Sequence, residues 1–149
     1  MSLLLFLQTG NFKGITLGMT LSTVENQLGK PVDISISKKP LIYKYDSVEF
    51  AFLRDKISGE YLLQSMHFYF NDSVIHDKYA TNTESIGSHT CSVPNSAIEY
   101  FERKGVRIQI DKKHTINNLQ LGFCTDAGVV IIYESIGTDL FKLNGFHHS

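Results

Sequence analysis

The chain has 149 residues, enough for one domain over residues 1–149 that buries roughly two thirds of its unfolded surface. Its 14 basic and 15 acidic side chains give a formal net charge of −1 with no cationic run, which disfavours a nucleic-acid partner. No apolar stretch reaches the length of a membrane span, and ten Phe and seven Tyr predict a sheet-rich core. The two cysteines, Cys91 and Cys124, are too few for a disulfide framework, so a cytoplasmic location is expected, with a single bridge between them left open.

The first predicted element covers residues 3–7, which are all apolar and lack the features of a secretory signal; we predict a buried strand. A helix is predicted over 20–28, because Thr20 can cap it and Gly29 and Pro31 end it. Its apolar residues recur at helical spacing: Leu21, Val24 and Leu28. The Ser- and Lys-rich stretch after Pro31 predicts a loose connector.

Three strands are predicted next, over residues 41–45, 48–52 and 61–70, with turns at 46–47 and 58–59. Period-two alternation divides the third strand between two faces of a sheet. The face predicted to join the core carries Leu62, Met66, Phe68 and Phe70. The opposite face carries Tyr61, Ser65, His67 and Tyr69.

Residues 71–94 are polar and keep no period, which predicts a long connection of the kind that is usually functional or poorly ordered. A second helix is predicted over 95–104, with Asn95 as its cap and Gly105 just past its end. Its predicted buried stripe is Ala97, Ile98 and Phe101. Strands over 106–110, 119–124 and 129–133 follow, the last two joined by a hairpin loop at 125–128.

Both halves of the chain show the order helix, glycine exit and hairpin, with a slowly growing offset. Independent packing of two common units and duplication explain this recurrence about equally well. Each helix has one apolar stripe and must bury it against another layer. We therefore predict an α+β fold of two helix-plus-hairpin units, in which two helices pack on one side of a mostly antiparallel sheet of six or more strands.

Four segments resemble, in the same order, a large group of uncharacterised small bacterial proteins: GITLGMTLSTVENQLGKP, YKYDSVEFAF, LLQSMHFYF and LQLGFCTDAGVVIIY. Members of this group often look like immunity or accessory proteins of polymorphic toxin systems. The helix motif also resembles SmpA-type lipoproteins and the β-lactamase inhibitor protein. The resemblance implies a protein partner, a cognate toxin, and it brings no catalytic residues. Asp46 stands where the group's pattern has a glycine.

The candidate metal ligands do not form a recognised pattern. His89 and Cys91 make one close pair, and a third ligand could come from Asp72, His76 or Asp77, whereas zinc sites recognised from sequence use two close pairs. We therefore predict no metal and no cofactor. Residues 147–148 are interpreted as a frayed or added histidine tail.

Catalytic motifs such as a nucleophile elbow, a phosphate-binding loop or a dinucleotide fingerprint are missing from the sequence. A more informative pattern is the set of aromatic residues on the strands between 41 and 70. If these share a half-exposed face, they predict a protein interface, because Tyr combines a large contact area with a polar tip. The predicted interface residues are Tyr43, Tyr45, Tyr61, His67 and Tyr69. In the alternative interpretation, the helices or the long connection cover this face and the tyrosines belong to the core.

Two functions follow from these observations. The first is a non-enzymatic, cytoplasmic protein-binding domain, which the resemblance extends to an immunity protein that blocks a toxin domain. The second is a small hydrolase or metal-dependent enzyme with its site under residues 71–94. The oligomeric state is left open.

Overall fold

The fold is described from a computed structural model, in which residues 3–46, 48–70 and 89–149 are described. Its helices are α1 (Leu3–Thr9), α2 (Leu21–Leu28), α4 (Pro94–Arg103) and the short 3-10 helix η1 (Lys112–His114). Its strands are β1 (Asp33–Lys38), β2 (Leu41–Tyr45), β3 (Val48–Arg54), β4 (Tyr61–Tyr69), β5 (Thr90–Cys91), β6 (Ile108–Ile110), β7 (Gln120–Thr125), β8 (Val129–Gly137) and β9 (Leu140–His148).

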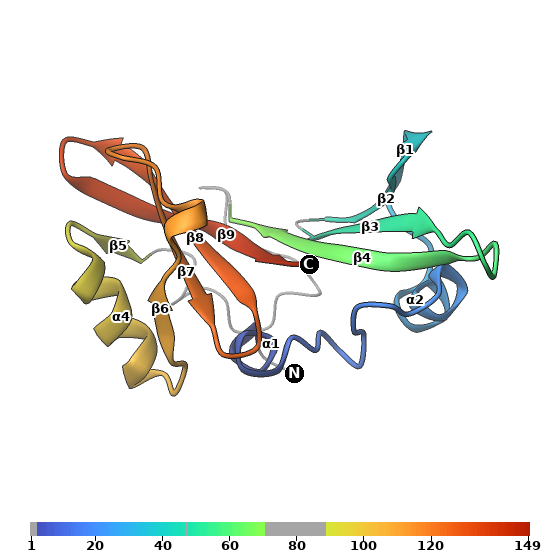
Figure 1. Ribbon diagram of the computed structural model, residues 1–149, viewed down its shortest axis with the longest axis horizontal. Coiled ribbons are helices and arrows are strands. Elements are labelled where there is room, and N and C mark those ends of the chain that lie inside the picture. Colours follow the sequence, from blue (N-terminus) through green and yellow to red (C-terminus); the bar gives the residue numbers. More distant parts are fainter. Residues whose placement is uncertain (1–2, 47, 71–88) are drawn as a thin grey trace.

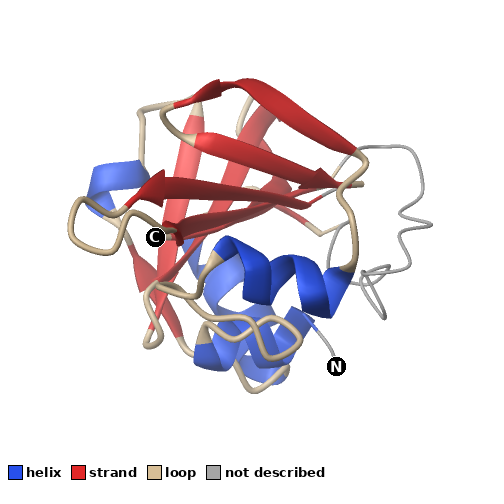
Figure 2. Cartoon of the chain, turned by 90° about the vertical axis from the view of Figure 1, so that its right-hand side faces the viewer, coloured by secondary structure: helices blue, strands red, loops and turns tan. Residues whose placement is uncertain are grey.

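The nine strands of the described residues belong to one antiparallel sheet with the order β1-β2-β3-β4-β9-β8-β7-β6, and β5 pairs with the part of β9 that does not pair with β4. The three α-helices of the described residues contribute to one core against this sheet; in Figure 1, α1 and α2 lie below the strands and α4 lies beside β6, and Figure 2 shows α-helices below the upper strands. The core contains side chains from each of these three helices, among them Phe6, Val24 and Phe101. The α+β class and the mostly antiparallel sheet are thus confirmed. We call the side of the sheet away from these helices the outer face.

The predicted helix-plus-hairpin unit is too small. In each half, a helix is followed by four antiparallel strands: α2 is followed by β1 to β4, and α4 by β6 to β9. The halves meet where the last strand of one pairs with the last strand of the other. This seam between β4 and β9 consists of Met66↔His148, His67↔His147, Phe68↔Phe146 and Tyr69↔Gly145.

The strand predicted over residues 3–7 is wrong, because this segment forms the first turns of α1. Leu3, Phe6 and Leu7 are buried, at the i, i+3 and i+4 spacing of a helix. In a run without polar residues, neither period can be read, so the sequence does not distinguish helix from strand. Gly10, with φ 70°, ends the helix as its N–H donates to the Phe6 carbonyl at 2.7 Å.

Helix α2 forms as predicted. The Thr20 hydroxyl accepts a hydrogen bond from the Thr23 N–H at 3.3 Å, and Val24 is fully buried. At the other end Gly29 adopts φ 81° and its N–H donates to the Glu25 carbonyl at 2.7 Å. The two caps therefore fix where the helix begins and ends.

Helix α4 begins one residue earlier than predicted, and Asn95 is not its cap. Val93 occupies the cap position and makes no side-chain capping bond, while Pro94 takes the first helical position. Proline is favoured there because its fixed φ suits the helix and its missing N–H would have no partner in the helix. Ala97 and Phe101 are buried as predicted, and Ile98 is partly buried against the core.

Three strands were not predicted. The segment interpreted as a connector forms β1, an edge strand with mostly exposed side chains. The two-residue β5 lies near the end of the segment predicted as a long connection. The third, β9, lies in the middle of the sheet between β4 and β8. Residues 147–148 are therefore not a frayed tail, since both pair with β4 and with β8.

A β-bulge in β4 changes which of its side chains face the helices. Ala51 of β3 pairs with Ser65, yet the next residue of β3 pairs with Leu63, so Gln64 is an extra residue on β4. Beyond the bulge the alternation is reversed. Leu63 joins the core in place of the predicted Leu62, and Tyr61 packs against the core instead of lying on the outer face.

Candidate functional site

One row of directly paired residues crosses the outer face from edge to edge. Its members are Asp33, Lys44, Glu49, His67, His147, Val130, Cys124 and Gln109, one from each of eight strands. Their neighbours along the strands, such as Phe50, Phe68 and Phe146, are buried on the helix side, which fixes the orientation of the row. The row therefore collects polar and titratable side chains on one surface.

The centre of the row is the histidine pair, His67 and His147, which faces outward at the seam. The two rings stack with centroids 4.1 Å apart at an angle of 15°. On β4 the His67 ring also stacks beside Tyr69, at 6.2 Å, and its Nε2 lies 3.3 Å from the Ser65 hydroxyl. Both imidazoles are half-buried by these contacts, while Tyr69 keeps 41% of its surface exposed.

A third histidine reaches the pair from η1. The His114 ring lies 6.4 Å from the His147 ring, and its Nδ1 is held 2.7 Å from Asp111 Oδ2. η1 can approach the sheet only because β7 carries Gly122 at this point. A Cβ on Gly122 would lie 2.6 Å from the Cβ of His114 and 2.7 Å from its carbonyl oxygen. A glycine on β7 therefore positions a histidine on the outer face.

Burial keeps the histidine pair neutral near pH 7. Burial, the largest cause, acts together with the positive charges that His67 and His114 would carry, and these lower the pKa of His147 to about 4. Burial also lowers the pKa of His67, against the opposing effect of the carboxylate of Glu49. The outer face thus holds two imidazoles that gain a charge only under acidic conditions or next to a new negative charge.

The carboxylates around the histidines already have partners. Glu49 forms an ion pair with Lys44 at 3.0 Å and accepts a hydrogen bond from the Tyr69 hydroxyl at 3.5 Å. Burial acts to raise the pKa of Asp111, but hydrogen bonds from the His114 ring and from the Lys113 N–H lower it overall. Neither carboxylate is left to neutralise a cation brought by a ligand.

Three of the five predicted interface residues do not lie on the outer face. Tyr43 and Tyr45 are buried under α2, where their hydroxyls donate to Glu25 Oε2 at 3.3 Å and to the Gly29 carbonyl at 2.9 Å. Tyr61 lies beyond the bulge on the helix side. His67 and Tyr69 do share the outer face, so the structure brings together two of the five.

His114, His147 and Glu49 were not among the predicted site residues. The alternation of Phe141, Leu143 and Phe146 with polar residues is a weak sign of a strand over 140–148. Nothing local indicates that this strand pairs with β4, since that contact spans the chain. The position of His114 depends on Gly122 of β7, and nothing in the sequence indicates that this glycine is needed there.

The histidine pair is not arranged to share a metal ion. The lone pairs of an imidazole lie in the plane of its ring, so two stacked rings direct them along separate planes. Among the residues that the structure describes, no group of three His, Cys, Asp or Glu side chains could hold a metal. The other predicted ligands Asp72, His76 and Asp77 lie outside the described residues.

The end of the 71–94 segment, from residue 89, forms a buried cluster beside α4. The His89 ring stacks on Tyr100 at 3.7 Å, and its Nδ1 is 2.7 Å from the hydroxyl of the fully buried Tyr133. Cys91 and Cys124 are both free thiols. Burial raises the pKa of Cys91 to about 11, the opposite of what a nucleophilic cysteine needs. The rest of the enzyme site predicted under residues 71–94 lies outside the described residues.

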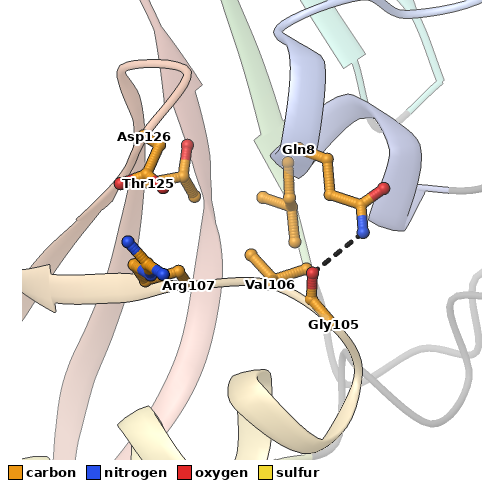
Figure 3. A pocket seen from close by; sticks show the side chains of 7 residues that line it. Gln8, Gly105, Val106, Arg107, Thr125 and Asp126 are labelled. Carbon is orange, nitrogen blue, oxygen red and sulfur yellow. Dashed lines mark hydrogen bonds between the residues drawn. The ribbon is translucent and has the colours of Figure 1, made fainter.

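A small pocket of about 270 Å³ opens between α1, the link after α4 and the β7–β8 turn (Figure 3). Leu7 and Val106 form its floor, and Arg107 and Asp126 lie at its rim. Gln8 of α1 also lines the pocket, and its side-chain amide donates a hydrogen bond to the Gly105 carbonyl at 2.9 Å. The pocket is below the size of most small-molecule sites, about 300 to 1,000 Å³.

None of the helices that the structure describes is long and apolar enough to span a membrane. Comparison of the chain with protein families, with curated proteins and with solved structures gave no match.

Proposed function

We propose that this chain is a non-enzymatic protein-binding domain whose outer face docks against a protein partner. The observation that carries the proposal is the surface formed by Tyr69, the histidine pair and His114. Half-buried aromatic rings on a rigid sheet are typical anchors of protein interfaces, because they bury a large area with little loss of rotamer freedom. Aromatic rings exposed on the face of a sheet suit a macromolecule better than a small substrate.

The resemblance to immunity proteins supports a more specific proposal, in which the partner is a toxin domain and the protein acts in the cytoplasm. An immunity protein works by occlusion and needs no catalytic group of its own. The outer face offers such a surface, since its polar atoms are held in place by neighbours, as in the ion pair of Glu49 with Lys44. Preorganised side chains lose little entropy on binding.

The test is affinity capture from the source organism, followed by dissociation constants for variants with the partner that is found. Tyr69→Ala and His67→Ala should each weaken binding by about 30-fold, the effect of losing an interface anchor worth about 2 kcal/mol. Ile57→Ala is the matched control, because Ile57 is 98% exposed in the turn between β3 and β4. It should bind as the wild type does.

Denaturation midpoints for all three variants establish that they are folded. If Tyr69→Ala and His67→Ala both bind the partner with wild-type affinity, the outer face is not the interface. The immunity role has a separate readout: the captured partner, expressed alone in a bacterial host, should stop growth, and co-expression of this chain should restore it. A partner that is harmless when expressed alone would leave the binding domain in place and exclude the immunity role.

A further inference from the structure

The chemistry of the partner can be inferred from the charged groups around the histidine pair. The two carboxylates near it, Glu49 and Asp111, already have partners in the chain, Lys44 and His114. Lys113, by contrast, is exposed on η1 and makes no ion pair with the described residues. Lys113 is therefore a cation beside the histidine pair that is available to a partner's carboxylate, whereas the two carboxylates there are already held by other side chains.

The two imidazoles of the histidine pair are neutral near pH 7, and each can gain a positive charge by binding a proton. Every neighbouring element contributes to their environment: Glu49 from β3, Ser65 and Tyr69 from β4, Asp111, Lys113 and His114 around η1, and His148 from β9. Stacking keeps two imidazoles close enough that a charge on one opposes a charge on the other. A carboxylate placed over the pair would reverse this balance, because it favours the protonated form of each ring.

We propose that the outer face binds an acidic segment of the partner protein, and that the histidine pair takes up protons from solvent as the partner's carboxylates dock beside Lys113. This inference rests on the proposed function and names the partner class. Each proton converts one imidazole into an imidazolium that donates a hydrogen bond to a carboxylate oxygen. The new N–H bond on each ring takes its proton from solvent, and no other covalent bond forms or breaks.

Proton uptake makes affinity depend on pH. If docking brings the pKa of even one imidazole back to about 6, the association constant rises about fourfold between pH 7.5 and pH 5.5, and more if both respond. The direction of this pH effect distinguishes the histidines from the partner's own carboxylates. Aspartates and glutamates lose negative charge as the pH falls through part of the same range, and that loss alone would weaken binding. Tighter binding at lower pH therefore reports on the histidines.

The test uses a fluorescent octaglutamate peptide as a probe, with an octalysine peptide of the same length as its opposite. Fluorescence anisotropy at low ionic strength gives dissociation constants at pH 7.5 and 5.5. We expect the wild type to bind octaglutamate at least fourfold more tightly at pH 5.5 and to bind octalysine weakly at both. His147→Gln should reduce the pH effect to less than twofold, and Lys113→Ala should weaken binding about threefold at both pH values.

Lys56→Ala is the matched control for Lys113→Ala, because Lys56 is exposed in the distant turn between β3 and β4. Thermal midpoints at both pH values identify any unfolded variant, and Lys113→Ala, at an exposed site, keeps the test decisive if His147→Gln unfolds. Equal binding of octalysine, or an affinity that does not change with pH, would overturn the inference. So would equally tight binding of an oligonucleotide of the same charge.

Failure of this inference is separable from failure of the proposed function. A natural partner that needs Tyr69 but binds with a pH-independent dissociation constant would leave the interface standing and remove the acidic segment. If octaglutamate binds in a pH-dependent way but the natural partner does not use this face, the site for an acidic segment stands and the proposed interface is removed.

Discussion

Acidification should destabilise this protein through the histidine pair before most carboxylates are protonated. The pKa of His147 is about 4 in the folded chain, whereas an unfolded chain has the ordinary value of 6.5. The unfolded state therefore binds the proton first as the pH falls. The stability that a neutral His147 confers is fully present above pH 6.5 and is lost progressively between pH 6.5 and pH 4.

The size of the effect follows from the shift and from the exposure of the ring. A shift of about 2.5 units corresponds to at most ~3.4 kcal/mol, since one unit is worth about 1.4 kcal/mol. The ring is only half-buried, so solvent screening should reduce this to roughly 1.5 kcal/mol. His67 acts in the same direction, because its pKa is also lowered, whereas Asp111 loses its contribution only below its usual pKa of 3.8.

Urea denaturation at pH 7.5, 6.0 and 4.5 measures this directly in the wild type and in His147→Gln. Glutamine fills part of the same space and does not titrate, so the variant should lose about 1.5 kcal/mol less than the wild type between the two extremes. At pH 7.5 it should be less stable by about 1 kcal/mol, for the loss of the stacked ring. Parallel pH profiles for the two proteins, or an NMR titration of His147 near pH 6.5, would refute the reasoning.

Three other predictions concern the sheet and its core. Gly145→Ala should destabilise the protein by about 3 kcal/mol or more, because its Cβ would overlap a carbonyl oxygen of β4 at the seam; Gly137→Ala, with open space around it, is the control in the same urea assay. Phe6→Ala should cost about 3 to 5 kcal/mol by opening a cavity under the sheet, and near-wild-type stability would show that α1 is not part of the core. In the native protein a thiol reagent should modify Cys124 and not the buried Cys91, and equal rates would contradict the packing beside α4.

The parts of the fold that the sequence predicts are those with local signals. The cap at Thr20 and the glycine at position 29 bound α2, and alternating residues with polar turns define β2 and β3. The helix over residues 3–9 was missed for a local reason too, because a run of apolar residues carries no period.

The candidate site was only half predictable, because it depends on pairing between distant segments. His67 and Tyr69 follow from the alternation in β4, which holds up to the bulge at Gln64. The bulge, which moves Tyr61 to the helix side, has no mark in the sequence. His147 joins His67 only because β9 enters the sheet beside β4, and such long-range register is set by the packing of the whole core.

The central place of β9 also sets the order in which the chain can fold during synthesis. Strands β1 to β4 leave the ribosome first, yet the edge of β4 along Met66–Tyr69 has no partner until residues 145–148 have been translated. Until then the nascent chain presents an unpaired strand edge beside apolar side chains such as Phe68, the kind of surface that associates with other chains. Closing the sheet then joins segments that are far apart in sequence, which slows folding. Slower translation or chaperones that bind nascent chains should therefore raise the yield of folded protein more than they would for a protein whose neighbouring strands are consecutive.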